Sequence, residues 1–343
     1  MPNSRQLELD KNTTWFQLTA LWAFVEVVLG GILHAIRMPF TGILVGGSAV
    51  FIIGAMVLHS QNPFRDIIRA TGVVLIVKAG ASPHSPFPAY IAVAYQGFSG
   101  AVIFSLIGNF RIAAFLFSIL AMLESALQKL ITLTLMYGMA FWEALNTFVH
   151  SVMKTLNLGN THNAEELVLG YIIVYAIWGV FLGYRLSIFY NRLPQLFSEI
   201  KLTENAKIEQ AIFNGTSSLN QKNHSRIIFW IVYILMLLAM VAILTYLHGV
   251  KQNIFYIVAR SLSVTFLLFL VVNPLFKWMV SKGSQKSKNQ MLVKLITEDF
   301  LVLRMEYNAC LRLVKARRIY FWKYILAVEY LIALRILKVR EQE

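Results

Sequence analysis

Long apolar segments constrain the fold of this chain more than any other feature. A helix needs about 20 mainly apolar residues to cross the ~30 Å hydrocarbon core of a bilayer. The chain has a mean hydropathy of +0.62 and only 14% charged residues. A soluble domain of this composition would expose too much apolar surface to water. We therefore predict an all-α, polytopic membrane protein with spans near residues 14–34, 41–59, 64–80, 88–108, 112–137, 167–190, 226–247 and 253–279.

The distribution of Lys and Arg predicts how these spans are oriented. With the N-terminus inside, 24 of the 31 basic residues lie in inner segments, 4 in outer segments and 3 within spans. Because basic residues favour the cytoplasmic side, we predict a multi-pass protein of the bacterial cytoplasmic (inner) membrane with both termini cytoplasmic. Cytoplasmic loops and membrane lipid head groups then account for the net charge of +14, and we expect no nucleic-acid partner.

Two further features narrow the class of protein. The first residues, MPNSRQLELDKNTTW, are polar and of mixed charge, so we expect no cleavable signal peptide. Cys310 is the single cysteine, which excludes an internal disulfide and gives no cysteine cluster for a metal.

Composition divides the chain into four parts. From Lys277 onward it carries fourteen basic and six acidic residues, interleaved with aromatic residues. This pattern suits helices that lie on an anionic leaflet or against partner helices. Residues 319–337 are apolar enough for a short ninth span, but Glu329 and Arg335 favour the surface. The predicted parts are a six-span bundle (1–192), a cytoplasmic connector (193–225), a two-span hairpin (226–280) and a basic amphipathic cytoplasmic tail (281–343).

The segment 139–156 has the pattern of an amphipathic helix. Glu143, Thr147, His150 and Lys154 form one stripe at helical spacing. We predict that this helix lies at the membrane interface instead of crossing.

The stretch KAGASPHSPFPAYIAVAYQG, residues 78–97, interrupts two apolar runs. It holds three of the eight prolines. Proline cannot continue a helix but fits its first turn, so we predict that one helix ends near Gly80 and the next begins at Pro88. One interpretation is a rigid turn with incidental polar groups. The other is a binding site, because polar groups gather near the start of a helix, where anions are attracted: Lys78, His84, Ser85, Tyr90 and Gln96.

Polar residues also fall inside predicted spans. Glu26, Glu124 and Gln128 are functional candidates, because a carboxylate in hydrocarbon is costly. The alternative is a structural pair, in which Glu26 or Glu124 meets Lys129, Arg185 or a neutral partner. Gly42-x-x-x-Gly46 predicts close packing between helices.

Residues 12–192 resemble an S component, the substrate-capture subunit of energy-coupling-factor (ECF) vitamin transporters. The resemblance lies in NPFRDIIRATGVVLIVKAGASPHSPFPAYIAVAYQGFSGAVIFSLIGNF and in the small-residue run TGILVGGSAVFIIGAM. It implies a six-helix bundle that captures a vitamin or precursor from the outer side and joins coupling and ATPase subunits. In place of the family's Ala-x-x-x-Ala docking motif the first helix has Thr19-x-x-x-Ala23. In the tail, Arg317 and Arg318 of KARR are similar to part of the Ala-Arg-Gly motif of coupling subunits.

The resemblance also implies where a small-molecule substrate would bind, in the outer loops and the outer halves of the later helices. The ligand-binding candidates on this sequence are Lys78, His84, Ser85, Tyr90, Tyr95 and Gln96, with Glu143, Asn146 and His150 joining from the outer amphipathic helix.

No catalytic motif accompanies these features. H-E-x-x-H, G-x-S-x-G and Walker A patterns are missing from the sequence, so we predict no enzyme, no catalytic residue, no bound metal and no cofactor. If ATP hydrolysis powers uptake, another chain must then hydrolyse the ATP. Capture of a small solute for uptake is the leading prediction. The alternatives are a membrane scaffold or assembly protein that recruits partners through its basic tail, and an intramembrane lipid-modifying enzyme.

Overall fold

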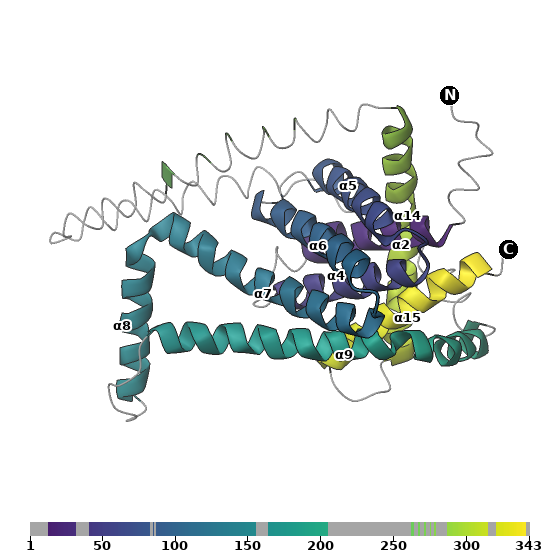
Figure 1. Ribbon diagram of the computed structural model, residues 1–343. Helices are drawn as coiled ribbons and strands as arrows, with labels where there is room; N and C mark the ends of the chain where they lie inside the picture. Colours follow the sequence, from purple (N-terminus) through teal and green to yellow (C-terminus); the bar gives the residue numbers. More distant parts are fainter. Residues whose placement is uncertain are drawn as a thin grey trace.

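The part of the chain that the computed structural model describes is helical throughout its regular structure (Figure 1). It comprises residues 13–31, 41–82, 85, 87–155, 164–204, 287–314 and 320–340, with a few single positions between 262 and 278. The elements are α2 (Thr14–Phe24), the π-helix η1 (Val25–Leu29), α4 (Thr41–Leu58), α5 (Pro63–Ala81), α6 (Phe87–Leu106), α7 (Phe110–Tyr137), α8 (Met139–Thr155), α9 (Ala164–Glu204), α14 (Ser287–Val314) and α15 (Tyr320–Arg340).

Local capping signals explain where several helices begin. The Asn62 side chain accepts a hydrogen bond from the Arg65 amide at 3.2 Å, and Pro63 occupies the first turn of α5. Asn109 caps α7 in the same way, accepting from the Arg111 amide at 3.0 Å. Each cap satisfies backbone donors that the first helical turn leaves without an internal partner.

The predicted break between the third and fourth helices is confirmed. α5 ends at Ala81, one residue beyond the predicted end, and Pro88 lies in the first turn of α6. Proline tolerates this position because the first-turn N–H groups have no partner within the helix.

A tight turn separates α7 from α8. Gly138 has a φ of 64°, which favours glycine over other residues. The predicted helix at 139–156 is confirmed as α8, which runs across the ends of α7 and α9, on the side of the molecule away from α14 (Figure 1). Its position at a membrane interface stays a prediction.

The core surrounds α2. Every residue from Leu18 to Val25 is at most 1% exposed. α2 packs against α4, α5, α14 and α15, so elements from both ends of the chain cover it. Large aromatic side chains fill this region, with Trp22 fully buried and Phe24 stacked edge-on against Phe300 of α14.

α7 and α9 pack closely against each other. A Cβ atom added at Gly179 would lie 2.7 Å from the Cα of Ile119, and one at Gly183 would lie 2.8 Å from the Cα of Phe115. The glycines therefore allow the two backbones to approach closely, as in other membrane helix pairs.

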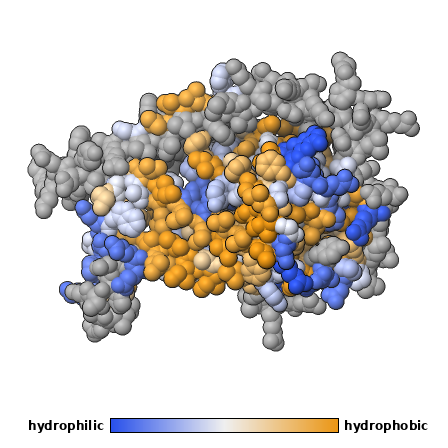
Figure 2. All heavy atoms as spheres, viewed as in Figure 1, coloured by the Kyte–Doolittle hydropathy of each residue, from blue (hydrophilic) through white to orange (hydrophobic). Residues whose placement is uncertain are grey.

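The outer faces of these helices are apolar. Leu120 and Leu127 of α7 and Ile177 of α9 are among the exposed large hydrophobic residues. Hydrophobic residues cover the centre of the face seen in Figure 2, and hydrophilic ones gather toward its two ends. Among the described residues, three helices are long and apolar enough to cross a membrane, namely Phe87–Leu106, Phe110–Tyr137 and Ala164–Phe189, with shorter apolar helices at Thr14–Leu29 and Gly42–Leu58. The chain therefore has the helices of a membrane protein, while the number of spans stays a prediction.

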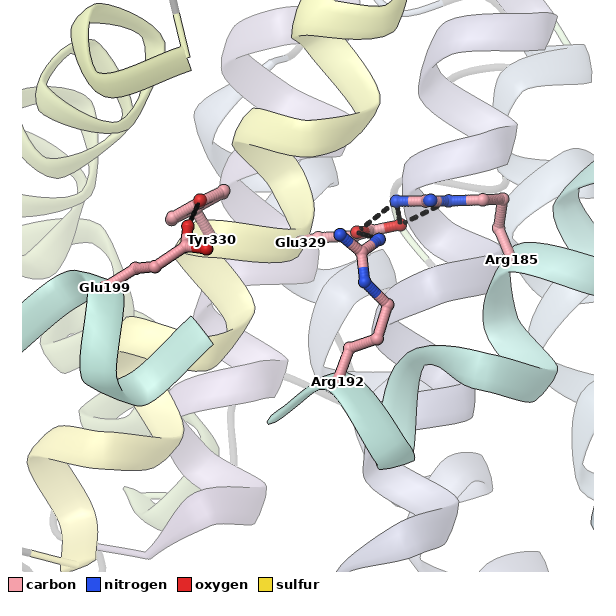
Figure 3. A network of polar contacts seen from close by, with 5 residues as sticks. All are labelled: Arg185, Arg192, Glu199, Glu329 and Tyr330. Atoms are coloured by element: carbon pink, nitrogen blue, oxygen red, sulfur yellow. Dashed lines mark hydrogen bonds and ion pairs between the residues drawn. The ribbon is translucent and has the colours of Figure 1, made fainter. Parts of the chain in front are cut away.

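The predicted surface location of residues 319–337 is wrong. α15 packs against α2, α4 and α9, and its residues from Leu331 to Leu337 are at most 5% exposed. Glu329, whose charge argued for the surface, is bound by Arg185 and Arg192 of α9 (Figure 3). The neighbouring Tyr330 donates a hydrogen bond to Glu199, also on α9. Partner charges from α9 thus offset part of the cost that an isolated carboxylate would carry.

Arg335 is compensated in a second network between α14 and α15. Its guanidinium lies 2.6 Å from Glu306 and 2.8 Å from Asp299, and it also donates to Gln17 of α2. Lys338 binds the other oxygen of Glu306 at 2.6 Å. The basic tail is therefore partly built into the bundle, in place of a separate amphipathic layer.

Two of the predicted segments are largely outside the described residues. The hairpin 226–280 is one, apart from single positions. The connector 193–225 is described only to residue 204, where α9 continues through Pro194 to Glu204.

Candidate functional site

A buried ion pair joins η1 to the last turn of α5. The Lys78 ammonium donates to the Glu26 carboxylate at 2.7 Å, and each side chain is 5% exposed. Glu26 stands in the π-helical turn, a local widening that is frequent at functional sites. Two charges removed from water are stable only when they are paired and further hydrogen-bonded.

The start of α6 completes the environment of Lys78. The ammonium also donates to the Ala89 carbonyl at 3.2 Å and lies 6.0 Å from the centre of the Tyr90 ring. Tyr90 is fully buried. The Ala89 carbonyl oxygen and the face of the Tyr90 ring both favour a positive charge. The first turn of α6 therefore stabilises the charged form of Lys78.

α7 contributes a second set of polar groups at the same end of the bundle. Gln128 donates to the Pro88 carbonyl. One turn earlier, Glu124 lies close enough to Glu26 for the two carboxylates to interact electrostatically. Its Oε2 atom is buried and has no hydrogen-bond partner among the described residues. The carboxylates of η1 and α7 therefore share one electrostatic environment, in which Lys78 supplies a compensating charge.

Gln96 reaches the interior from the third turn of α6. Its side chain is 3% exposed, and its Oε1 atom lacks a hydrogen-bond partner in the described part of the chain. A Cβ added at Gly46 would lie 3.2 Å from the Gln96 amide nitrogen and 3.3 Å from the Ser125 hydroxyl. Glycine at position 46 thus makes room for two polar side chains between α4, α6 and α7. We call Glu26, Lys78, Tyr90, Gln96 and Glu124 the polar cluster.

Other predicted ligand residues of α6 and the preceding loop are outside the cluster. Ser85 forms a turn with Ser82, through hydroxyl groups 2.8 Å apart and a backbone hydrogen bond of 3.1 Å. Tyr95 is 36% exposed and faces away from the core, although it interacts electrostatically with Glu124. His84 lies outside the described residues.

The structure does not bring the residues of α8 to the polar cluster. α8 packs on α7 and α9, beyond the end of α7. Asn146 accepts a hydrogen bond from the Ala164 amide at 2.7 Å, which satisfies a donor at the start of α9. Glu143 is exposed and His150 half-buried. Asn146 thus caps a helix, and the ligand role expected of Glu143, Asn146 and His150 stays a prediction.

The expected docking residues of the first helix are also placed differently. Thr19 and Ala23 are fully buried, and the Thr19 hydroxyl donates to the Trp15 carbonyl at 2.7 Å. Because helices of the same chain cover them, they offer no surface to a partner. Arg317 and Arg318 lie outside the described residues.

A small cavity lies between α4, α9 and α15. Its lining includes Ser48, Trp178 and Tyr324, and the Ser48 and Tyr324 hydroxyls are 2.6 Å apart. The volume of about 10 Å³ has room for roughly one water molecule, too little for an organic solute. This cavity is therefore not the ligand site.

Sequence reasoning identified the members of the cluster but not their pairing. Glu26 was expected to meet Lys129 or Arg185 if it was structural; instead it binds Lys78, Arg185 binds Glu329, and Lys129 is exposed. Ser125 was missed altogether. Its spacing of one turn from Gln128 and its position next to Glu124 were the available signals.

Comparison of the chain with protein-family models, with curated proteins and with solved structures gave no match. The polar cluster therefore carries the functional argument.

Proposed function

We propose that this protein is an integral membrane transport component that captures a small solute from the outer face for uptake. The observation that supports the proposal most is the buried Glu26–Lys78 pair, extended by Tyr90 and the Ala89 carbonyl. Ionisable groups held inside a membrane bundle are expensive, and they are typical of substrate and ion pathways.

The location of the cluster also favours this function. Lys78 lies one turn before the end of α5, and Tyr90 lies in the first turn of α6. On the predicted topology this is the outer end of both helices. A solute arriving from outside would meet the Ser82–Ser85 turn first and then polar groups inside an otherwise apolar bundle, the usual composition of a ligand site.

In the resemblance to S components, energy for uptake would come from coupling and ATPase subunits. The buried positions of Thr19 and Ala23 mean that such subunits would dock on another surface of this chain. The scaffold alternative relied on a free basic tail, and the packing of α15 into the bundle disfavours it.

A ligand screen by thermal unfolding tests the proposal. Purified protein in detergent is heated with vitamins, vitamin precursors and other small polar solutes. We expect at least one solute to raise the melting temperature of the wild type and of Lys154→Ala, an exposed control on α8, but not of Tyr90→Phe or Gln96→Leu. If the wild type responds to no solute, and membrane vesicles containing it accumulate none, the proposal fails.

A further inference from the structure

The polar cluster carries an imbalance of charge and of hydrogen bonding. Lys78 neutralises Glu26 at 2.7 Å. Glu124 is a second carboxylate in the same electrostatic environment, and no described basic residue forms an ion pair with it. Lys129, the nearest basic residue along α7, is exposed. With all groups ionised, the cluster therefore has one negative charge in excess.

Two acceptor oxygens of the polar cluster lack a hydrogen bond in the described part of the chain. The Glu124 Oε2 and Gln96 Oε1 atoms are buried oxygens without a partner in the described residues. Both are acceptors, and Gln96 is 3% exposed, so bulk water does not satisfy it. A buried oxygen that receives no hydrogen bond is costly, so the two sites favour an incoming group that donates.

The two oxygens belong to facing segments of α6 and α7. Tyr95, next to Gln96, interacts electrostatically with Glu124. The Gln96 amide nitrogen and the Ser125 hydroxyl, next to Glu124, both border Gly46. Gln128, one turn beyond Glu124, reaches the carbonyl of Pro88, two turns before Gln96, which keeps the two helices in this alignment.

We propose that the site takes a small organic cation, a solute whose protonated amine donates hydrogen bonds to Glu124 and Gln96. The ammonium supplies the positive charge that the cluster lacks and the donors that both oxygens lack. Lys78 stays with Glu26 and sets the charge balance, in place of binding an anion. This inference rests on the proposed capture function and specifies its substrate class.

Matched solutes test the substrate class. Primary amines and the alcohols of the same carbon skeleton, such as benzylamine and benzyl alcohol, are compared by thermal shift and by isothermal titration. We expect the amines to stabilise the wild type and the alcohols to have little effect. Glu124→Gln, which keeps the shape of the side chain, should weaken amine binding by about 10- to 100-fold, the effect of a lost charged hydrogen bond. Glu143→Gln, an exposed glutamate of α8, should bind as the wild type does.

The outcomes separate the two proposals. If neutral or anionic solutes bind and amines do not, or if Glu124→Gln binds amines unchanged, the cation inference is overturned and the capture function stands. If no solute of any charge binds, both are overturned. Size-exclusion profiles and the melting temperature without solute show whether Glu124→Gln is folded; if it is not, Gln96→Leu replaces it, with the same expected loss of amine binding.

Discussion

Arg185 of α9 donates to both carboxylate oxygens of Glu329 of α15, across 2.6 to 3.0 Å. The two residues are 144 positions apart in the sequence. Arg192 also binds this carboxylate, so the contacts attach α15 to α9 (Figure 3). α15 is thus part of the bundle core.

Removal of the carboxylate should destabilise the protein strongly. Glu329→Ala leaves the arginines of α9 without their anion in a buried setting, and we expect a loss of about 3 kcal/mol in the free energy of unfolding. Glu298→Ala is the control, because its pair with Lys294 is 3.9 Å long and exposed, and its loss should stay within about 0.5 kcal/mol. Unfolding by SDS in mixed micelles measures the free energy of both variants. Equal losses would contradict a stabilising role for the buried Glu329 carboxylate.

The Glu26–Lys78 pair should show strong coupling in a double-mutant cycle. Lys78→Met strands a buried carboxylate and should cost about 3–5 kcal/mol. The double variant Glu26→Gln with Lys78→Met removes both charges and should regain at least half of that loss. Additive effects of the two single substitutions would show that the charges act independently.

The glycines of α9 should be intolerant of a single added methyl group. Gly179→Ala places a Cβ against the backbone of α7, which cannot move aside like a side chain, so we expect a loss of about 1–3 kcal/mol. Gly170→Ala, in the same helix, meets nothing within 4 Å and should be neutral or stabilising. A Gly179→Ala variant as stable as Gly170→Ala would rule out the close approach of α7 and α9.

Cys310 should be nearly inert in the folded protein. Burial, followed by the negative charge of Glu306, raises the pKa of its thiol to about 12. At pH 8 the thiol is therefore protonated, and protonated thiols react poorly. We expect maleimide labelling in mild detergent to be at least about a hundredfold slower than after unfolding in SDS. Because the chain has one cysteine, mass spectrometry of the intact protein reads this directly; rapid labelling of folded protein would place the thiol at the surface.

Impermeant reagents can test the predicted orientation. Lys154→Cys on α8 and Lys294→Cys on α14 are made separately in a Cys310→Ser background, and both positions are exposed. If positively charged segments face the cytoplasm, a membrane-impermeant maleimide should label only the α8 variant in intact cells. The α14 variant should be labelled after permeabilisation. The reverse pattern would invert the topology.

Helix ends were predictable because their signals are local. One helix ends near Gly80 and the next starts near Pro88 because of the backbone sterics and the missing N–H group of proline. Both effects depend only on a few neighbouring residues. The amphipathic stripe of α8 is local in the same sense. Membership of the polar cluster was predictable for Lys78, Tyr90 and Gln96, because polar residues in apolar runs are visible without a fold.

Pairing was not predictable, because a charge does not specify its partner along the sequence. Glu26 and Lys78 are 52 positions apart, and several basic residues were equally plausible partners. The location of α15 was predicted wrongly for the same reason. Glu329 and Arg335 indicate a surface helix when considered alone, but acidic and basic residues of α9 and α14 convert them into buried contacts. Only the tertiary structure supplies those neighbours.

The position of α15 has a consequence for biogenesis. α2, α4 and α9 leave the ribosome well before residues 320–340, yet these residues cover them in the finished bundle. Until then, the buried face of α2 and the guanidinium of Arg185 have to be shielded by lipid, by water or by the insertion machinery. Domains generally fold as units during synthesis, but here the first membrane helices stay without their final neighbours until translation has passed α15.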